Sequence, residues 1–194
     1  MLLACVVNPE AAQKVQEELD DMVGNGRLPR FADRENLLYT NAFVLEVLRW
    51  HSTVPTVIHV VGEDDIYDDY LIPKGSIVAA NIWNMLHDAK IYPDPFSYKP
   101  ERFLGPHPQR DSRDICFGFG RRTCPGRELA EASVFITATM SLTVFDITKT
   151  VVDGVAVEPK IEHATGAISH PKPFVCSIKP RSQKTVDLIS EEAY

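Results

Sequence analysis

The sequence has no apolar run long enough to cross a membrane, no excess of basic residues and only four cysteines. A membrane-spanning helix needs about 20 apolar residues. The opening MLLACVV is too short for one, and it lacks the basic flank and cleavage site of a signal peptide. We therefore expect no membrane anchor in this chain. The net charge of −7 argues against a nucleic-acid partner, because phosphate binding needs a basic surface.

The four cysteines, Cys5, Cys116, Cys124 and Cys176, include no C-x-x-C pair. Their spacing fits neither a zinc site nor a disulfide framework, which favours a reducing compartment. For Cys5, Cys116 and Cys176 we expect small, buried apolar side chains. Cys124 differs because it stands in the glycine-rich stretch FGFGRRTCPG, directly before a predicted helix.

The hydrophobic pattern of the 194 residues predicts mainly helices, with several short strands. Helices are predicted over residues 8–24, 39–50 and 127–142, with a helical turn over 83–88. Strands are predicted over residues 56–61, 70–72, 76–80, 144–152, 155–157, 167–168 and 174–178. Five prolines between Pro93 and Pro108 predict ordered coil, and the polar tail after Pro180 is expected to be frayed.

The stretch around Cys124 has the residue types that would suit a soft metal centre. A sulfur placed just before a helix lies near free backbone N–H groups and the positive end of the helix dipole, which stabilise a thiolate. Thiolates are preferred ligands of soft metals. Phe117 would shield this sulfur from water, and Arg122 would neutralise a carboxylate at the edge of a bound group.

Small residues in the same stretch would leave room for a large, flat ligand. Gly118, Gly120 and Gly126 allow a close approach of the backbone. Ala130 lies four residues after Gly126, so the two share one face of the predicted helix. The alternative is a dinucleotide loop, but its G-x-G-x-x-G pattern is not met, because Thr123 stands where the last glycine would be.

The complete pattern F-x-x-G-x-R-x-C-x-G, from Phe117 to Gly126, resembles the signature of the cytochrome P450 superfamily, the haem-thiolate monooxygenases. The residues 46–49, EVLR, match the E-x-x-R helix of that family, and the residues 100–103, PERF, match its P-E-R-F segment. The similarity runs from about Asn8 to Arg181 and fits microsomal fungal members best.

The resemblance implies the C-terminal part of the cytochrome P450 fold, a mainly α structure with small β-sheets. Residues 1–194 would then form a single partial domain that lacks the N-terminal half of the fold. The missing part would include the long helix that crosses above the haem and its acid–alcohol pair. We interpret MLLACVV as the last turns of that helix.

The resemblance also implies roles for individual residues. Cys124 would be the axial thiolate of haem b, and Arg122 and His59 would face its propionates; for His59 a packed structural histidine is the alternative. The cofactor-binding residues would be Phe117, Gly118, Gly120, Arg122, Cys124, Gly126, Ala130 and His59. The substrate-lining residues would be Val54, Thr56, Val57, Ala167 and Ile168.

Glu46 and Arg49 lie three residues apart on one predicted helix face. Taken by themselves they would form a solvated ion pair worth about 0.2–0.5 kcal/mol. The resemblance implies instead a buried network that includes Arg102 of the P-E-R-F segment. Breaking a buried pair leaves a charge without a partner, which is far more destabilising.

The implied reaction is an O₂-dependent hydroxylation of a lipophilic small molecule. Electrons would come from NADPH through a separate flavoprotein reductase, with cytochrome b5 as a further donor. A full-length relative would lie at the cytosolic face of the endoplasmic reticulum membrane. Two alternatives remain open: a truncated, non-catalytic fragment, and a haem-binding module without turnover.

The segment 101–127 holds six arginines against three acidic residues, although the whole chain is acidic. The unpaired arginines would form a basic patch on the cysteine side of the haem, and such a patch would attract an acidic electron donor. The alternative is a mixed, solvated surface in which these arginines have internal partners.

Overall fold

The computed structural model describes the backbone of residues 1–192 and the side chains of residues 1–190. Its α-helices are α1 (Leu2–Val7), α2 (Pro9–Met22), α3 (Leu38–Trp50), α4 (Ile82–Leu86), α5 (Arg113–Cys116), α6 (Arg127–Val144) and α7 (Gln183–Glu192). Three 3₁₀ turns are η1 (Phe31–Asn36), η2 (Pro100–Phe103) and η3 (Gly120–Arg122). The strands are β1 (Val57–Val60), β2 (Asp65–Tyr67), β3 (Tyr70–Ile72), β4 (Ile77–Ala80), β5 (Phe145–Thr148), β6 (Val151–Val152), β7 (Val155–Ala156) and β8 (Ser177–Pro180).

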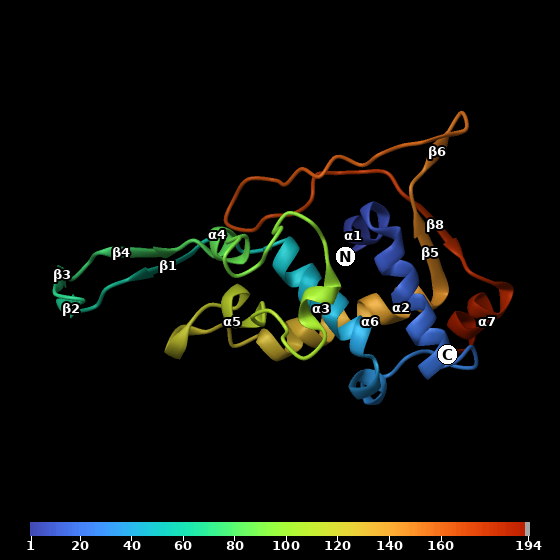
Figure 1. The fold of residues 1–194 in the computed structure, drawn as a ribbon, viewed down its shortest axis with the longest axis horizontal. Helices are drawn as coiled ribbons and strands as arrows, with labels where there is room; N and C mark the ends of the chain where they lie inside the picture. Colours follow the sequence, from blue (N-terminus) through green and yellow to red (C-terminus); the bar gives the residue numbers. More distant parts are fainter. Residues whose placement is uncertain (193–194) are drawn as a thin grey trace.

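Helices α1, α2, α3 and α6 pack together as the body of the molecule (Figure 1). Their apolar faces meet in one core, in which Val15, Leu19, Phe43, Phe135 and Leu142 are at most 1% exposed. Helix α2 contributes to this core because its apolar residues recur at intervals of three and four. It ends at Met22, and Gly24, two residues later, closes it as predicted: its φ of 76° is left-handed and its N–H bonds to the carbonyl of Leu19.

Within residues 1–192 the strands form four separate two-stranded antiparallel sheets. Strand β1 pairs with β4, Val57 opposite Ala80, and β2 pairs with β3 at the tip of the same arm, which projects from the helical body (Figure 1). Ile58, Val60 and Ile77 on this arm are each more than 60% exposed. The arm therefore gains little of its order from burial and holds mainly through strand pairing.

The predicted strand over residues 144–152 is wrong in its bounds. Helix α6 continues through Val144, and the β-branched run then divides between β5 and β6. Asp153 and Gly154, with φ of 52° and 80°, form the tight turn between β6 and β7. β5 pairs instead with β8, 29 or more residues further along the chain, so pairing with a distant strand decides where β5 ends.

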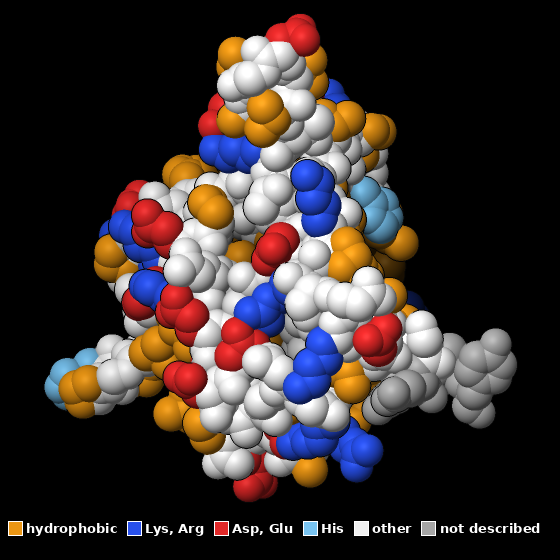
Figure 2. Space-filling view, turned by 90° about the vertical axis from the view of Figure 1, so that its right-hand side faces the viewer, with side chains coloured by type: hydrophobic (Ala, Val, Ile, Leu, Met, Phe, Trp, Pro, Cys, Tyr) orange, Lys and Arg blue, Asp and Glu red, His pale blue; other side chains and the backbone are white. Residues whose placement is uncertain are grey.

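Three further predictions near the C-terminus are corrected. The strand predicted over residues 174–178 lies instead at Ser177–Pro180, the strand β8. Residues 167–168 lie in a loop and not in a strand. Within the tail, Gln183–Glu192 form helix α7 instead of fraying, because Ser182 and Thr185 exchange hydrogen bonds at its start and Thr185 is buried; residues 193–194 lie outside the described part. Figure 2 views the molecule from this end, where acidic and basic side chains alternate over the surface without a field of one sign.

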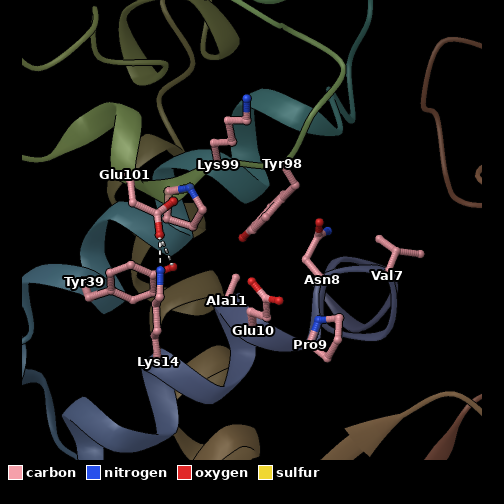
Figure 3. A pocket seen from close by; sticks show the side chains of 11 residues that line it. Val7, Asn8, Pro9, Glu10, Ala11, Lys14, Tyr39, Tyr98, Lys99 and Glu101 are labelled. Atoms are coloured by element: carbon pink, nitrogen blue, oxygen red, sulfur yellow. Dashed lines mark hydrogen bonds and ion pairs between the residues drawn. The ribbon is translucent and has the colours of Figure 1, made fainter.

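The proline-rich segment is mostly irregular, as predicted, but residues 100–103 form the 3₁₀ turn η2. Pro100 starts this turn, where a missing N–H costs nothing. Its Glu101 points toward α2, and Lys14 Nζ and the Tyr39 hydroxyl donate to Glu101 Oε1 at 2.6 and 3.0 Å (Figure 3). η2 is thereby tied to α2 on one side and, through Arg102, to α3 on the other.

Candidate functional site

The cysteine loop, residues 117–126, connects α5 to α6 through the turn η3. The carbonyl of Phe117 accepts hydrogen bonds from the N–H of Cys124 at 2.8 Å and from the hydroxyl of Thr123 at 3.2 Å. Gly118, with φ of 79°, allows the chain to reverse between these residues. The loop is thus closed on itself by the backbone of Phe117, and the cysteine is held immediately before α6.

Cys124 carries an exposed thiol and lines a cavity together with a second cysteine, Cys116. The cavity has a volume of about 370 Å³ and lies between the C-terminal end of α3 and the cysteine loop. Its lining comprises Leu48, His51, Thr53, Val54, Val57, Cys116, Phe117, Gly118, Arg122, Cys124, Ala130 and Val134. Most of this surface is apolar, so a bound group would lose contact with water on that side.

Seven of the residues singled out in the sequence line this cavity: Val54, Val57, Phe117, Gly118, Arg122, Cys124 and Ala130. Gly126 lies beside it, since a Cβ built on this glycine would be 3.8 Å from Cys124 Sγ. Gly120 starts η3 with a φ of 55°. The residues that do not line the cavity are Thr56, His59, Ala167 and Ile168.

His59 lies on β1 opposite Val78, on the projecting arm and away from the cavity lining. Ile168 is 59% exposed in the loop between β7 and β8. The neighbouring Ser169, however, donates its N–H to the carbonyl of Thr53 at 2.7 Å. The loop therefore reaches the wall of the cavity through Ser169 and not through the two residues that the sequence suggested.

His51 is a cavity residue that the sequence analysis did not single out. Its ring stacks on that of His163 with centroids 4.6 Å apart, and its Nε2 lies 3.2 Å from the carbonyl oxygen of Ser169. Burial first, and then the neighbouring His163, lower the pKa of His51 to about 4. The imidazole is consequently neutral at pH 7 and anchors the C-terminal loop to the end of α3.

The second thiol of the cavity differs in chemistry from the first. Burial, with a smaller effect from Asp111, raises the pKa of Cys116 to about 12. Cys116 therefore remains a protonated, unreactive thiol at neutral pH. Only Cys124 combines an exposed sulfur with a position at the start of a long helix.

Behind the cavity, Glu46, Arg49 and Arg102 form one buried ionic network. Arg49 donates from Nε to Glu46 Oε2 at 2.7 Å and from Nη2 to Oε1 at 2.9 Å. Arg102 Nε donates to Glu46 Oε1 at 3.1 Å. The remaining guanidinium N–H groups donate to backbone carbonyls, among them those of Leu86 and Ser97, and Arg102 Nη1 also donates to the side-chain oxygen of Gln109 at 2.8 Å.

The network has a clear structural effect. A single carboxylate bonds to two arginines from different segments, and its Oε1 also accepts the N–H of Lys99 at 2.8 Å. The end of α4 and the proline-rich segment 93–103 are thereby fixed to helix α3.

Comparison with known proteins identifies the family. The family model described as cytochrome P450 matches residues 1–178. The chain belongs to the cytochrome P450 family. It is 52% identical over 192 residues to cytochrome P450 monooxygenase 208 of Postia placenta, and 47% identical over 192 residues to cytochrome P450 monooxygenase claR of Ampulloclitocybe clavipes. These matches cover 97% and 96% of this chain, but 38% and 36% of the relatives.

A solved zebrafish cytochrome P450, determined with abiraterone, superposes with a TM-score of 0.84 at 30% identity. The superposition covers 93% of this chain and 43% of the zebrafish chain. The predicted mainly α fold with small β-sheets, as part of a cytochrome P450 structure, is therefore confirmed. The chain spans less than two fifths of the curated relatives named above, in line with the predicted C-terminal portion.

Cytochrome P450 proteins bind haem, and the residues present suit that group. A sulfur donor opens into an apolar cavity, glycine and alanine leave space beside it, and Arg122 supplies a positive charge at the cavity wall.

No helix among residues 1–192 of this cytochrome P450 chain is both long and apolar enough to cross a membrane.

Some of the cavity residues could have been found from the sequence. Val134 follows Ala130 by four residues, so a helical face through Gly126 and Ala130 includes it. Leu48 and His51 carry no such signal, because their place in the wall depends on how α3 meets the cysteine loop. Cys116 was expected to be a packed thiol, and its pKa agrees with that expectation.

Proposed function

We propose that this chain supplies the cysteine side of a haem site, with Cys124 as the axial thiolate. The supporting observation is the exposed sulfur of Cys124 at an apolar cavity, held by backbone hydrogen bonds directly before α6. Residues 1–194 would act as one part of a larger domain, since the relatives are longer than this chain.

Each remaining site residue would have a definite task. Phe117 and Gly118 would lie beside the sulfur and limit its contact with water. Ala130 and Gly126 would leave room for the flat face of the group. Arg122, exposed at the cavity wall, would pair with a propionate. His59 does not line the cavity. It would reach a propionate only after a movement of the arm or closure by the rest of the protein.

The whole protein would oxidise a small molecule with O₂. Haem supplies the oxygen-activating redox chemistry when it is bound, and a thiolate ligand favours cleavage of the O–O bond. Val54, Val57 and Leu48 would exclude water from that chemistry and favour a lipophilic substrate, because their side chains are apolar. Hydroxylation is the reaction that this arrangement supports best.

The partners follow from the same proposal. Electrons would come from NADPH through a separate flavoprotein reductase, or from cytochrome b5, at the endoplasmic reticulum membrane. The basic patch for this donor is smaller than the sequence suggested, because Arg102, Arg113 and Arg127 have acidic partners. It would consist of the exposed Arg110 and Arg121, because Arg122 would already pair with a propionate.

The decisive experiment compares the two thiols of the cavity in the full-length protein. We expect the wild type, after reduction and treatment with carbon monoxide, to show the shift of the haem Soret band that is typical of a thiolate ligand. Cys124→His should lose this shift, whereas Cys116→Ala should keep it, because the Cys116 thiol is half-buried and stays protonated. A shift retained in Cys124→His, or a protein that binds no haem when supplied with hemin, would refute the proposal.

A further inference from the structure

A buried carboxylate lies behind the cysteine loop and has no task in the function proposed above. Glu131, on the second turn of α6, is 3% exposed. Arg113 Nη1 donates to its Oε2 at 2.7 Å, and Arg127 Nε donates to its Oε1 at 3.0 Å. Arg34 of η1 adds a longer contact, with Nη2 at 3.5 Å from Oε2. Guanidinium groups from three different elements therefore surround one carboxylate.

One of these arginines also reaches the cysteine loop. The guanidinium carbon of Arg127 lies 6.0 Å from the centre of the Phe117 ring. A cation placed over an aromatic face is attracted by it. Phe117 is in turn the residue whose carbonyl receives the N–H of Cys124 at 2.8 Å. Contacts thus run without a gap from Glu131 through Arg127 and Phe117 to the backbone of Cys124.

The charges explain why the carboxylate matters. Burial by itself would raise the pKa of Glu131, but hydrogen bonds from Arg113 and Arg127 hold it below its usual value of 4.5. Glu131 is therefore ionised at neutral pH. Without its charge, Asp111 would be left to balance Arg113, with 2.6 Å between Nη2 and Oδ2, and Arg127 would have no acidic partner. Two neighbouring guanidinium groups would then repel each other.

We propose that Glu131 is a positioning residue for Cys124: it holds Arg127 against Phe117 and so fixes the backbone of the cysteine loop. The importance of Glu131 for catalysis rests on the proposed function. The geometry of the cysteine loop that Glu131 controls is a property of this chain even without haem. The carboxylate neither lines the cavity nor touches the sulfur, so its effect passes through the other two residues.

The test uses the full-length protein, both haem-free and haem-loaded, with Glu131→Gln as the variant. Hydrogen bonds to a charged group can each change a local opening equilibrium about tenfold. We therefore expect the amide of Cys124 to exchange at least about tenfold faster in the haem-free variant, with a smaller change in the amides of α2. In the haem-loaded protein, the carbon monoxide spectrum that is typical of a thiolate ligand should be lost at a lower temperature in Glu131→Gln than in the wild type.

Glu128→Gln is the matched control, because Glu128 lies on the same helix, one turn earlier, and is exposed. If Glu131→Gln does not fold, Arg127→Gln serves instead, since it leaves Glu131 bonded to Arg113. Combining Glu131→Gln with Phe117→Leu should give less than the sum of the two single effects, because both act through one contact.

Two results would overturn the proposal: exchange at Cys124 that is equal in Glu131→Gln and Glu128→Gln, or fully additive effects in the double variant. Failure of the proposed function is recognised separately. A wild type that lacks the thiolate-type spectrum would remove the haem ligand, while the exchange experiment on the haem-free protein would still decide the role of Glu131.

Discussion

Arg49 forms a two-point ion pair with Glu46 one turn earlier in α3, and both side chains are completely excluded from solvent. Such a pair contributes less to stability than its geometry suggests, because both charges have lost their hydration. Removing one partner is a different matter. The remaining charge stays buried, and the segments that the network joins to α3 lose their attachment.

We predict that Glu46→Ala or Arg49→Ala lowers the free energy of unfolding by about 3–5 kcal/mol. In the full-length protein, either change should also abolish haem incorporation, measured as the ratio of haem to protein absorbance. Lys14→Ala is the control: it breaks the pair with Glu101, which adds little to stability because both side chains are exposed and solvent screens their charges. Normal haem content in Glu46→Ala would contradict the prediction.

The cysteines should differ strongly in their reaction with an alkylating agent. Cys124 is exposed, whereas burial raises the pKa of Cys5 and of Cys116 to about 12. Because the thiolate is the reacting species, we expect haem-free protein at pH 7.5 to be labelled at Cys124 at least about tenfold faster than at Cys5 or Cys116. Mass spectrometry of peptides gives the rates.

Labelling in denaturant provides the reference for that comparison, since all four thiols should then react at similar rates. Bound haem should protect Cys124 if its sulfur is the ligand. Fast labelling of Cys116 in the native protein would show that the wall of the cavity is open, contrary to the structure.

The stacked histidines predict a loss of stability in mild acid. The pKa of His51 is lowered from 6.5 to about 4 in the folded chain, so the unfolded chain binds its proton more readily. This stabilisation is complete above about pH 6.5 and is lost as the pH falls toward 4. We expect the melting temperature to drop by roughly 2–4 °C per kcal/mol lost over that range.

His51→Gln should flatten this pH dependence, because an amide can still bond to the Ser169 carbonyl but does not titrate between pH 4 and 6.5. His163 stacks on the same ring, and burial lowers its pKa as well, so part of the dependence should remain. His107→Gln is the control, since His107 is exposed in a loop. A variant that melts with the pH profile of the wild type would show that the stack does not govern acid stability.

The proposed basic patch leads to a prediction about electron delivery. Arg121 is exposed and has no acidic partner among the contacts of residues 1–192. In the full-length protein, Arg121→Glu should slow reduction by a flavoprotein donor several-fold at low salt, and less at high salt, where charges are screened. Lys160→Glu, on an exposed segment before β8, should have no such effect. Stopped-flow reduction at two ionic strengths decides between these outcomes.

The long helices were predicted well, because the residues that define a helix lie close together in the sequence. Helix α2 has a regular apolar period and a terminal glycine, while α3 and α6 are long runs rich in apolar residues. The strands near the C-terminus were placed less well, since the ends of β5 depend on β8 and not on its own residues. Helix α7 was missed because its start depends on hydrogen bonds between two small polar residues.

The candidate site shows the same division between local and distant information. Residues close to Cys124 in sequence, such as Phe117 and Ala130, could be assigned from spacing, and they do line the cavity. His51 and Leu48 could not, because their position follows from packing of α3 against the loop. Arg127 lies four residues before Glu131 on the same helix, but its other partners, Arg34 and Arg113, come from separate segments that no local pattern brings to it.

The projecting arm of β1 and β4 has a consequence for handling the chain in the laboratory. Each strand pairs on one side and leaves its outer backbone groups open, and its isoleucine and valine side chains face solvent. Open edges of this kind recruit strands from other molecules. Recombinant chain prepared by itself should therefore collect in inclusion bodies, and charged replacements at Ile58 or Ile77 are the first remedy to try.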